Sequence, residues 1–221
     1  MRKVIVAVYV SLDGVMQSPG APEEDATGGF ELGGWMVPFA DDELAGFMDE
    51  AMGQDYDLLL GRRSYEMLAA VWPSAKGDLA RKLNAAGKYV VAGPETELTW
   101  SGSHRLEGDV IEAVAELKQG KGPPLIIFGS RKLIQALLPH DLIDEITLLV
   151  IPVVLGSGKR LFDVGDPAGA WALAKTRHSS KGVVASTYRR AGDLHTGAAY
   201  QEPSKAELAR RKRLAAEDQP S

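Results

Sequence analysis

The sequence predicts an α/β fold with a mainly parallel central sheet, helices on both of its faces and an antiparallel C-terminal edge. Short apolar runs rich in β-branched residues alternate with segments whose apolar residues recur at helical spacing, which is typical of parallel sheets. The last two strand-like runs, 171–177 and 183–189, follow each other with no helix between them, and they therefore predict an antiparallel pair.

The composition suits one globular domain with a polar tail. Of the 221 residues, 45% are hydrophobic, which is enough for one sizeable core. The formal net charge of −5 argues against a general nucleic-acid binder, because phosphate contacts need clustered Lys and Arg. No stretch approaches the roughly 20 apolar residues of a membrane span. We therefore expect a protein that binds neither nucleic acid nor membranes.

Residue usage excludes several kinds of site. Cysteine is absent, so disulfides, thiolate nucleophiles and Cys-based zinc sites are excluded. The 4 histidines are scattered and form neither H-x-E nor H-E-x-x-H, so we expect no metal site. A chain without cysteine fits a reducing compartment, and we expect a cytoplasmic protein.

The first element is predicted to be a buried strand over 4–10. A signal peptide also has a charged start and an apolar run, but this run is short and no small-residue cleavage site follows it. Residues 17–34 then form a long segment rich in glycine, proline and acidic side chains. Long loops in compact domains are often lids or binding loops; the alternative is a surface insertion.

A helix is predicted over 41–52, where apolar residues recur at helical spacing behind two aspartates. Its Glu43 lies on or near the inner face. A partly buried carboxylate facing a pocket could supply a proton, which makes Glu43 the candidate catalytic residue. The alternative role of this acidic group is capping and stabilisation of the helix dipole.

Two glycine turns carry the strongest chemical signal, because ligands of open α/β sheets bind beyond the carboxyl ends of the strands. The first is Gly61-Arg62-Arg63-Ser64, after the run 57–60. Its glycine lets a strand turn sharply into a helix, whose first N–H groups favour an anion. The alternative is a helix start with solvated arginines.

The second turn, Gly129-Ser130-Arg131, repeats this arrangement after the run 125–128. Two such turns suit a ligand with more than one phosphate, such as a dinucleotide. Neither turn matches G-x-G-x-x-G or the P-loop, so a standard Rossmann site is unsupported.

The other elements are predicted from the same periodicities. They are helices over 64–71, 78–86, 109–119 and 132–138, a strand over 88–91 and a long apolar run over 143–154. We expect a domain over 1–190 and a polar tail over 191–221. A capping-box pattern at Ser204 predicts a tail helix over 206–217. Its basic cluster either touches an acidic partner or is solvated.

Together these pieces resemble the dihydrofolate-reductase-like superfamily. The closer similarity is to the reductase domain of the bacterial riboflavin-pathway deaminase-reductase and its stand-alone relatives. The ordered motifs over about 1–190 that carry the resemblance are Ser11-Leu12-Asp13-Gly14-Val15-Met16, Gly33-Gly34-Trp35, Gly61-Arg62-Arg63-Ser64-Tyr65-Glu66, Phe128-Gly129-Ser130 and Gly156-Ser157-Gly158-Lys159-Arg160-Leu161-Phe162. The resemblance implies a three-layer dihydrofolate-reductase-like fold and an NADPH site.

The resemblance also implies roles for single residues. Gly61, Arg62, Arg63 and Ser64 match the turn at the cofactor phosphates, with Arg62 a candidate for the 2′-phosphate. Gly129, Ser130 and Arg131 match the second phosphate turn, and Asp13, Gly14 and Val15 match the loop beside the nicotinamide. Trp35 and Glu43 match an active-site tryptophan and carboxylate. Ala92-Gly93 departs from the Ser-Arg of many relatives, and the long 17–34 loop and two extra residues near Asp41-Asp42 precede Glu43.

The expected function is therefore hydride transfer from NADPH to a small pterin-like, pyrimidine or carbonyl substrate. The alternative is a non-catalytic NADP(H)-binding or regulatory protein on the same fold, and a third possibility is a true riboflavin-pathway reductase. The resemblance further implies a homodimer.

Overall fold

A computed structural model describes residues 1–198 and 202–217, and its centre is an eight-stranded sheet with the order β4-β3-β2-β5-β1-β6-β8-β7. The strands are β1 (Val4–Ser11), β2 (Asp57–Gly61), β3 (Lys88–Val91), β4 (Ser103–Leu106), β5 (Leu125–Ile127), β6 (Glu145–Ile151), β7 (Trp171–His178) and β8 (Val184–Arg190). In this order, every pair of neighbouring strands from β4 through β6 is parallel, whereas β8 runs antiparallel to both β6 and β7. The predicted fold class is confirmed.

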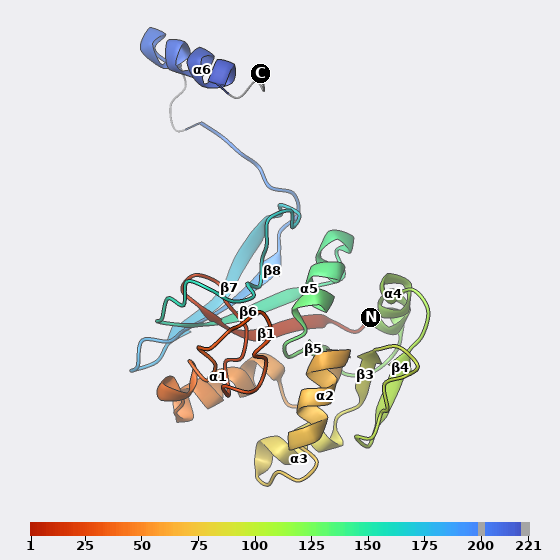
Figure 1. Ribbon diagram of the computed structural model, residues 1–221. Helices are drawn as coiled ribbons and strands as arrows, with labels where there is room; N and C mark the ends of the chain where they lie inside the picture. The colour runs from red at the N-terminus through yellow and green to blue at the C-terminus, as the bar shows by residue number, and fades with distance from the viewer. Residues whose placement is uncertain (199–201, 218–221) are drawn as a thin grey trace.

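Helices cover both faces of this sheet and give the fold three layers (Figure 1). In β1 the side chains alternate between two cores, with Val6 and Val8 in one and Ala7 and Tyr9 in or against the other. The helices on the Tyr9 side are α1 (Asp42–Met52), α2 (Arg62–Val71) and α3 (Asp78–Ala85), and those on the other side are α4 (Val110–Gln119) and α5 (Arg131–Leu137).

The helix starts follow the capping residues in the sequence. The Asp41 carboxylate accepts a hydrogen bond from the Leu44 N–H at 2.8 Å and caps α1. The Asp109 carboxylate accepts from the Ile111 and Glu112 N–H groups at 2.9 and 3.1 Å and caps α4. Both predicted N-termini are confirmed.

Several elements differ from the expected ones. Strand β4 was not expected, because its Ser-His-Arg-Leu sequence has no apolar run; it lies at the sheet edge and pairs with β3. Strand β6 ends at Ile151, just before Pro152, which has no N–H to donate. Two 3₁₀ helices, η1 (Val37–Phe39) and η2 (Leu138–His140), were also missed.

The tail carries the helix α6 (Lys205–Glu217), which Figure 1 shows well away from the sheet. The Ser204 hydroxyl accepts from the Glu207 N–H at 3.2 Å, as the capping pattern predicts, and no residue of α6 is buried. Residues 199–201 and 218–221 of the predicted tail lie outside the described residues, and the division into domain and tail stays a prediction. Every helix within 1–198 and 202–217 is too short or too polar to cross a membrane.

Candidate functional site

The structure brings the two glycine turns together, because β2 and β5 are neighbours in the sheet. The Gly61 N–H donates to the Ser130 hydroxyl at 2.8 Å, so one turn holds the other. A side chain at Gly129, whose φ is +96°, would come within 3.4 Å of the Ser64 Oγ. That distance is an ordinary contact, so it is the positive φ at Gly129 that favours glycine there, and the absence of side chains keeps the backbone of both turns accessible.

Both turns open into helices whose first N–H groups have no side-chain cap. Helix α2 starts at Arg62 behind Gly61, and α5 starts at Arg131 behind Ser130. The positive ends of the two helix dipoles thus converge on the same place, where a negatively charged group is stabilised.

A cavity of about 820 Å³, here named the main cleft, lies at these two turns. Its basic end is formed by Arg62, Arg63, Arg131 and Lys132. Arg62 pairs with Glu66 at 2.9 Å, and Arg131 pairs with Asp163. Within the described part of the chain, Arg63 and Lys132 have no carboxylate partner. These two side chains are therefore free to bind an anion, in a cleft that Glu23, Glu24, Asp25 and Glu66 also line.

The apolar lining of the main cleft, here named its apolar end, is formed by Tyr9, Met16, Met67 and Phe128. The rings of Tyr9 and Phe128 meet edge to face, with their centroids 6.4 Å apart. Burial raises the pKa of the Tyr9 hydroxyl to about 12.

Strand β1 also exposes part of its backbone here. Its pairing with β5 ends at Val6, and Ala7, Val8 and Tyr9 then line the main cleft. Because β5 is only three residues long, this stretch of β1 has a free edge on that side. A planar group with amide-like donors and acceptors fits such an edge.

The long loop lies against the cleft, with Gln17–Pro19 and Glu23–Thr27 among the lining residues. The Gln17 side-chain amide donates to the backbone oxygens of Asp25 and Thr27 at 2.7 and 2.9 Å. The Lys159 ammonium binds the Asp25 carboxylate and the Thr27 hydroxyl, each at 2.5 Å. This placement supports the interpretation of the segment as a binding loop.

The predicted nicotinamide loop lies behind the main cleft. The Asp13 carboxylate accepts from the Ser11 hydroxyl at 2.7 Å and from the Leu155 and Gly156 N–H groups at 3.1 and 2.9 Å. The Ser11 hydroxyl and these N–H groups hold the pKa of Asp13 well below its usual range. Gly14 makes the turn with a φ of +79°, and Val15 is fully buried. The lining residues are instead the next two, Met16 and Gln17.

The predicted catalytic and substrate-binding side chains do not line the main cleft. Trp35 is buried, and its indole N–H donates to the Gln17 backbone oxygen at 2.8 Å. The Glu43 carboxylate accepts from the N–H and hydroxyl of Ser180 at 2.9 and 2.6 Å, in the turn between β7 and β8. These hydrogen bonds from Ser180 lower the pKa of Glu43.

Sequence reasoning missed Tyr9, Met67, Phe128 and Lys159 as lining residues. For Tyr9 a signal existed, because a residue with a polar tip is unusual inside an otherwise aliphatic buried strand. Met67 and Phe128 carry no such signal, since apolar residues are expected in any core.

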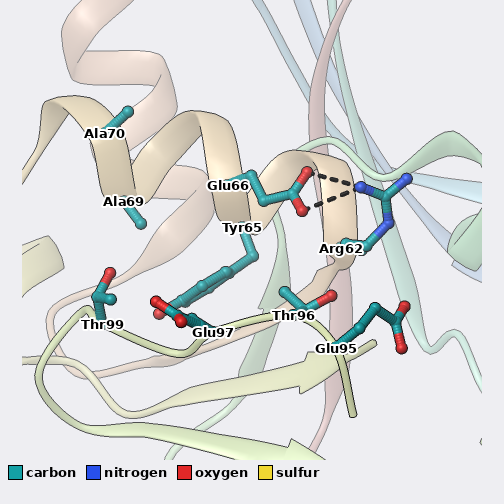
Figure 2. Close-up of a pocket in the computed structure, with 9 residues that line it drawn as sticks. All are labelled: Arg62, Tyr65, Glu66, Ala69, Ala70, Glu95, Thr96, Glu97 and Thr99. Carbon is teal, nitrogen blue, oxygen red and sulfur yellow. Dashed lines mark hydrogen bonds and ion pairs between the residues drawn. The ribbon is translucent and has the colours of Figure 1, made fainter. Parts of the chain in front are cut away.

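A second hollow of about 620 Å³ lies on the other side of Arg62, between α2 and the segment after β3 (Figure 2). Glu66, Glu95 and Glu97 line it together with Arg62 and Thr96. Figure 2 shows the Arg62 guanidinium directed at the Glu66 carboxylate along the same helix. The carboxylates of this second hollow make it a poor site for a phosphate.

Among the described residues, no group of three or more His, Asp or Glu side chains could hold a metal ion.

Comparison with protein families matches residues 2–185 to the family described as the RibD C-terminal domain. Among curated proteins, the chain is 27% identical over 193 residues to the uncharacterized protein YyaP of Bacillus subtilis strain 168, a match that covers 85% of this chain and 94% of YyaP. A putative riboflavin biosynthesis protein from Shewanella sp. PV-4 has a similar structure, with a TM-score of 0.59, 18% identity and coverage of 86% of this chain and 99% of that one. Dihydrofolate reductase from Enterococcus faecalis, complexed with NADP(H) and RAB-propyl, gives a TM-score of 0.56 at 15% identity over 85% of this chain and 96% of that one.

Proposed function

Because this chain belongs to the RibD C-terminal domain family, we propose that it is a reductase that uses NADPH to reduce a small pterin-like, pyrimidine or carbonyl substrate. The observation that supports the proposal is the main cleft itself. It joins two interlocked, uncapped glycine turns and four basic side chains to an apolar end that carries the rings of Tyr9 and Phe128. A dinucleotide needs that combination, with anion-binding groups for its phosphates and a dry, flat site for its nicotinamide.

The residues present fit such a cofactor. The backbone around Gly61 and Gly129 would take the phosphates, with Arg63 and Lys132 supplying charge. Arg62 would exchange its partner Glu66 for a 2′-phosphate. This exchange is favourable, because an exposed ion pair on a helix contributes only about 0.3–0.5 kcal/mol and a phosphate bonds a guanidinium more strongly. When bound, the cofactor supplies the hydride, and the protein orients it against the substrate.

The experiment is a thermal shift with NADPH and NADH on the wild type, Arg62→Ala and Glu66→Gln. A ligand at 100 times its Kd stabilises the native state by about 2.7 kcal/mol, which raises Tm by roughly 5–10 °C in a chain of this size. We expect NADPH to act more strongly than NADH. Arg62→Ala should lose that difference and Glu66→Gln should enlarge it, because it frees the guanidinium.

Arg81→Ala is the matched control, since Arg81 is also an exposed, ion-paired arginine on a helix but lines neither hollow. It should keep the wild-type response. No Tm shift with either nucleotide would remove the basis of the proposed function.

The alternative is a non-catalytic NADP(H)-binding protein, and one observation favours it: Glu43, the predicted catalytic carboxylate, is bonded to Ser180 outside the main cleft. Nucleotide binding without NADPH oxidation across pterin, ribosylpyrimidine and quinone-like substrates would support it.

We further propose that the protein is cytoplasmic and forms a homodimer. Sedimentation of a monomer alone at micromolar concentration would contradict the dimer.

A further inference from the structure

Tyr9 stands out at the apolar end of the main cleft. Its ring packs against Phe128, yet burial is the single cause of its shifted pKa, and no group of the described residues forms a hydrogen bond with its hydroxyl. Its hydroxyl is also not sealed inside the protein. Across 1–198 and 202–217, the fully buried side-chain oxygens without a partner are those of Tyr56 and Thr96. A lining residue therefore carries a free donor that a ligand can reach.

The neighbouring polar side chains at this end are already occupied. The Gln17 amide bonds the backbone of Asp25 and Thr27, and its oxygen accepts from the Lys159 N–H at 3.0 Å. The Lys159 ammonium is held by Asp25 and Thr27. Glu43 lies outside the cleft. Lys159 keeps one further N–H, but its ammonium is held in the loop by two acceptors, whereas the Tyr9 hydroxyl has no partner among the described residues.

The chemistry of the phenol suits hydrogen-bond donation. With a pKa of about 12, Tyr9 keeps its proton across the whole neutral range. A partly buried donor without a partner is unfavourable, and a ligand acceptor that pairs with it removes this cost. The walls of Phe128 and Met67 favour a flat, apolar body around that acceptor.

We propose that the Tyr9 hydroxyl donates a hydrogen bond to the carbonyl oxygen of a small, planar, conjugated substrate in the main cleft. This inference rests on the proposed reductase function. In the reaction, the carbonyl carbon gains a C–H bond from the hydride, and the C=O π pair moves to the oxygen. That oxygen takes the Tyr9 proton, and the phenolate recovers a proton from water.

The test uses 4-(dimethylamino)cinnamaldehyde, a coloured aldehyde whose visible band moves to longer wavelength when its oxygen accepts a hydrogen bond. It is added with NADP⁺, which has no hydride to transfer, so the readout is a spectrum and not turnover. We expect a red shift with the wild type. Tyr9→Phe should lose most of the shift and bind the aldehyde about 2- to 10-fold more weakly, as expected for one hydrogen bond.

Tyr89→Phe is the matched control, because Tyr89 also packs against another ring, that of His104 at 5.6 Å, but does not line the cleft. It should keep the full red shift. Tyr9→Phe retains the ring against Phe128 and removes an unpartnered donor, so its Tm should not fall below that of the wild type.

The outcomes separate the two proposals. If NADP⁺ raises Tm but the wild type shows no red shift, or Tyr9→Phe keeps it, the role of Tyr9 is overturned and the proposed function stands. If NADP⁺ fails to raise the Tm of the wild type, both are overturned.

Discussion

Asp13 illustrates how one side chain can shape the main cleft without lining it. Its carboxylate joins the end of β1 to the Leu155-Gly156 segment, and the Arg160 side chain donates to its backbone oxygen at 2.9 Å. The loop that follows is thereby held so that Met16 reaches the main cleft. The resemblance implied that Asp13 lies beside the nicotinamide. In the structure Met16 and Gln17 line the main cleft, and Asp13 does not.

The pH dependence of stability follows from these bonds. The folded-state pKa of Asp13 is lowered, so its ionised form favours the native state. This contribution is fully present above the unfolded pKa of about 4 and is lost progressively as the pH falls from there through the lower folded-state pKa. The Tm difference between the wild type and Asp13→Asn should therefore shrink from pH 7 to pH 3.

Thermal denaturation at each pH measures this difference. Asp55→Asn is the control, because Asp55 is exposed and has no hydrogen bond or ion pair among the described residues. A Tm difference for Asp13→Asn that stays constant with pH would contradict the expected role of the carboxylate.

The two glycine turns act as a single unit at the scale of elements. Strand β2 lies beside β5, and the Gly61 N–H is satisfied by the Ser130 hydroxyl rather than by a strand. Ser130 adopts a left-handed conformation with a φ of 65°, which glycine would adopt more easily. The hydroxyl therefore explains why a serine stands at this position.

Ser130→Ala should lower the free energy of unfolding by about 1–2 kcal/mol, because the Gly61 N–H loses its acceptor while the backbone strain stays. It should also weaken NADPH binding, since the first turn is no longer held. Ser130→Gly, which relieves the strain, should cost less. Urea denaturation measures the change, with Ser74→Ala as an exposed control whose hydroxyl bonds one backbone oxygen. If Ser130→Ala lowers the free energy of unfolding no more than Ser74→Ala does, the hydrogen bond from Gly61 to Ser130 does not hold the two turns together.

The main cleft is a product of the whole molecule. Its lining residues come from β1, the long loop, both glycine turns and Lys159, which are widely separated in the chain. They meet because β1 and β2 flank β5, so three carboxyl ends lie at one edge of the sheet. The tail lies outside this arrangement, since α6 has no buried residue.

Removal of the tail after residue 194 should therefore leave Tm within about 2 °C of the full chain and NADPH binding unchanged. Helix α6 buries no apolar side chain, so little hydrophobic stabilisation is lost. Differential scanning calorimetry of the two chains measures this, and truncation at residue 185, which cuts β8, is the destabilising control. A large Tm loss on removal of the tail alone would show that it packs on the domain.

The sequence by itself determined the sheet apart from β4, most helices and the two glycine turns. Hydrophobic periodicity, turn glycines and capping aspartates are local signals, because each depends on residues that are close together in the sequence. The sequence could not show that Glu43 bonds Ser180 while Tyr9 faces the cleft. The position of Glu43 depends on the contact of α1 with the turn between β7 and β8. The exposure of Tyr9 to the cleft depends on the short β5, which leaves part of β1 unpaired on that side. Only the tertiary structure decides such contacts, because they join segments more than a hundred residues apart.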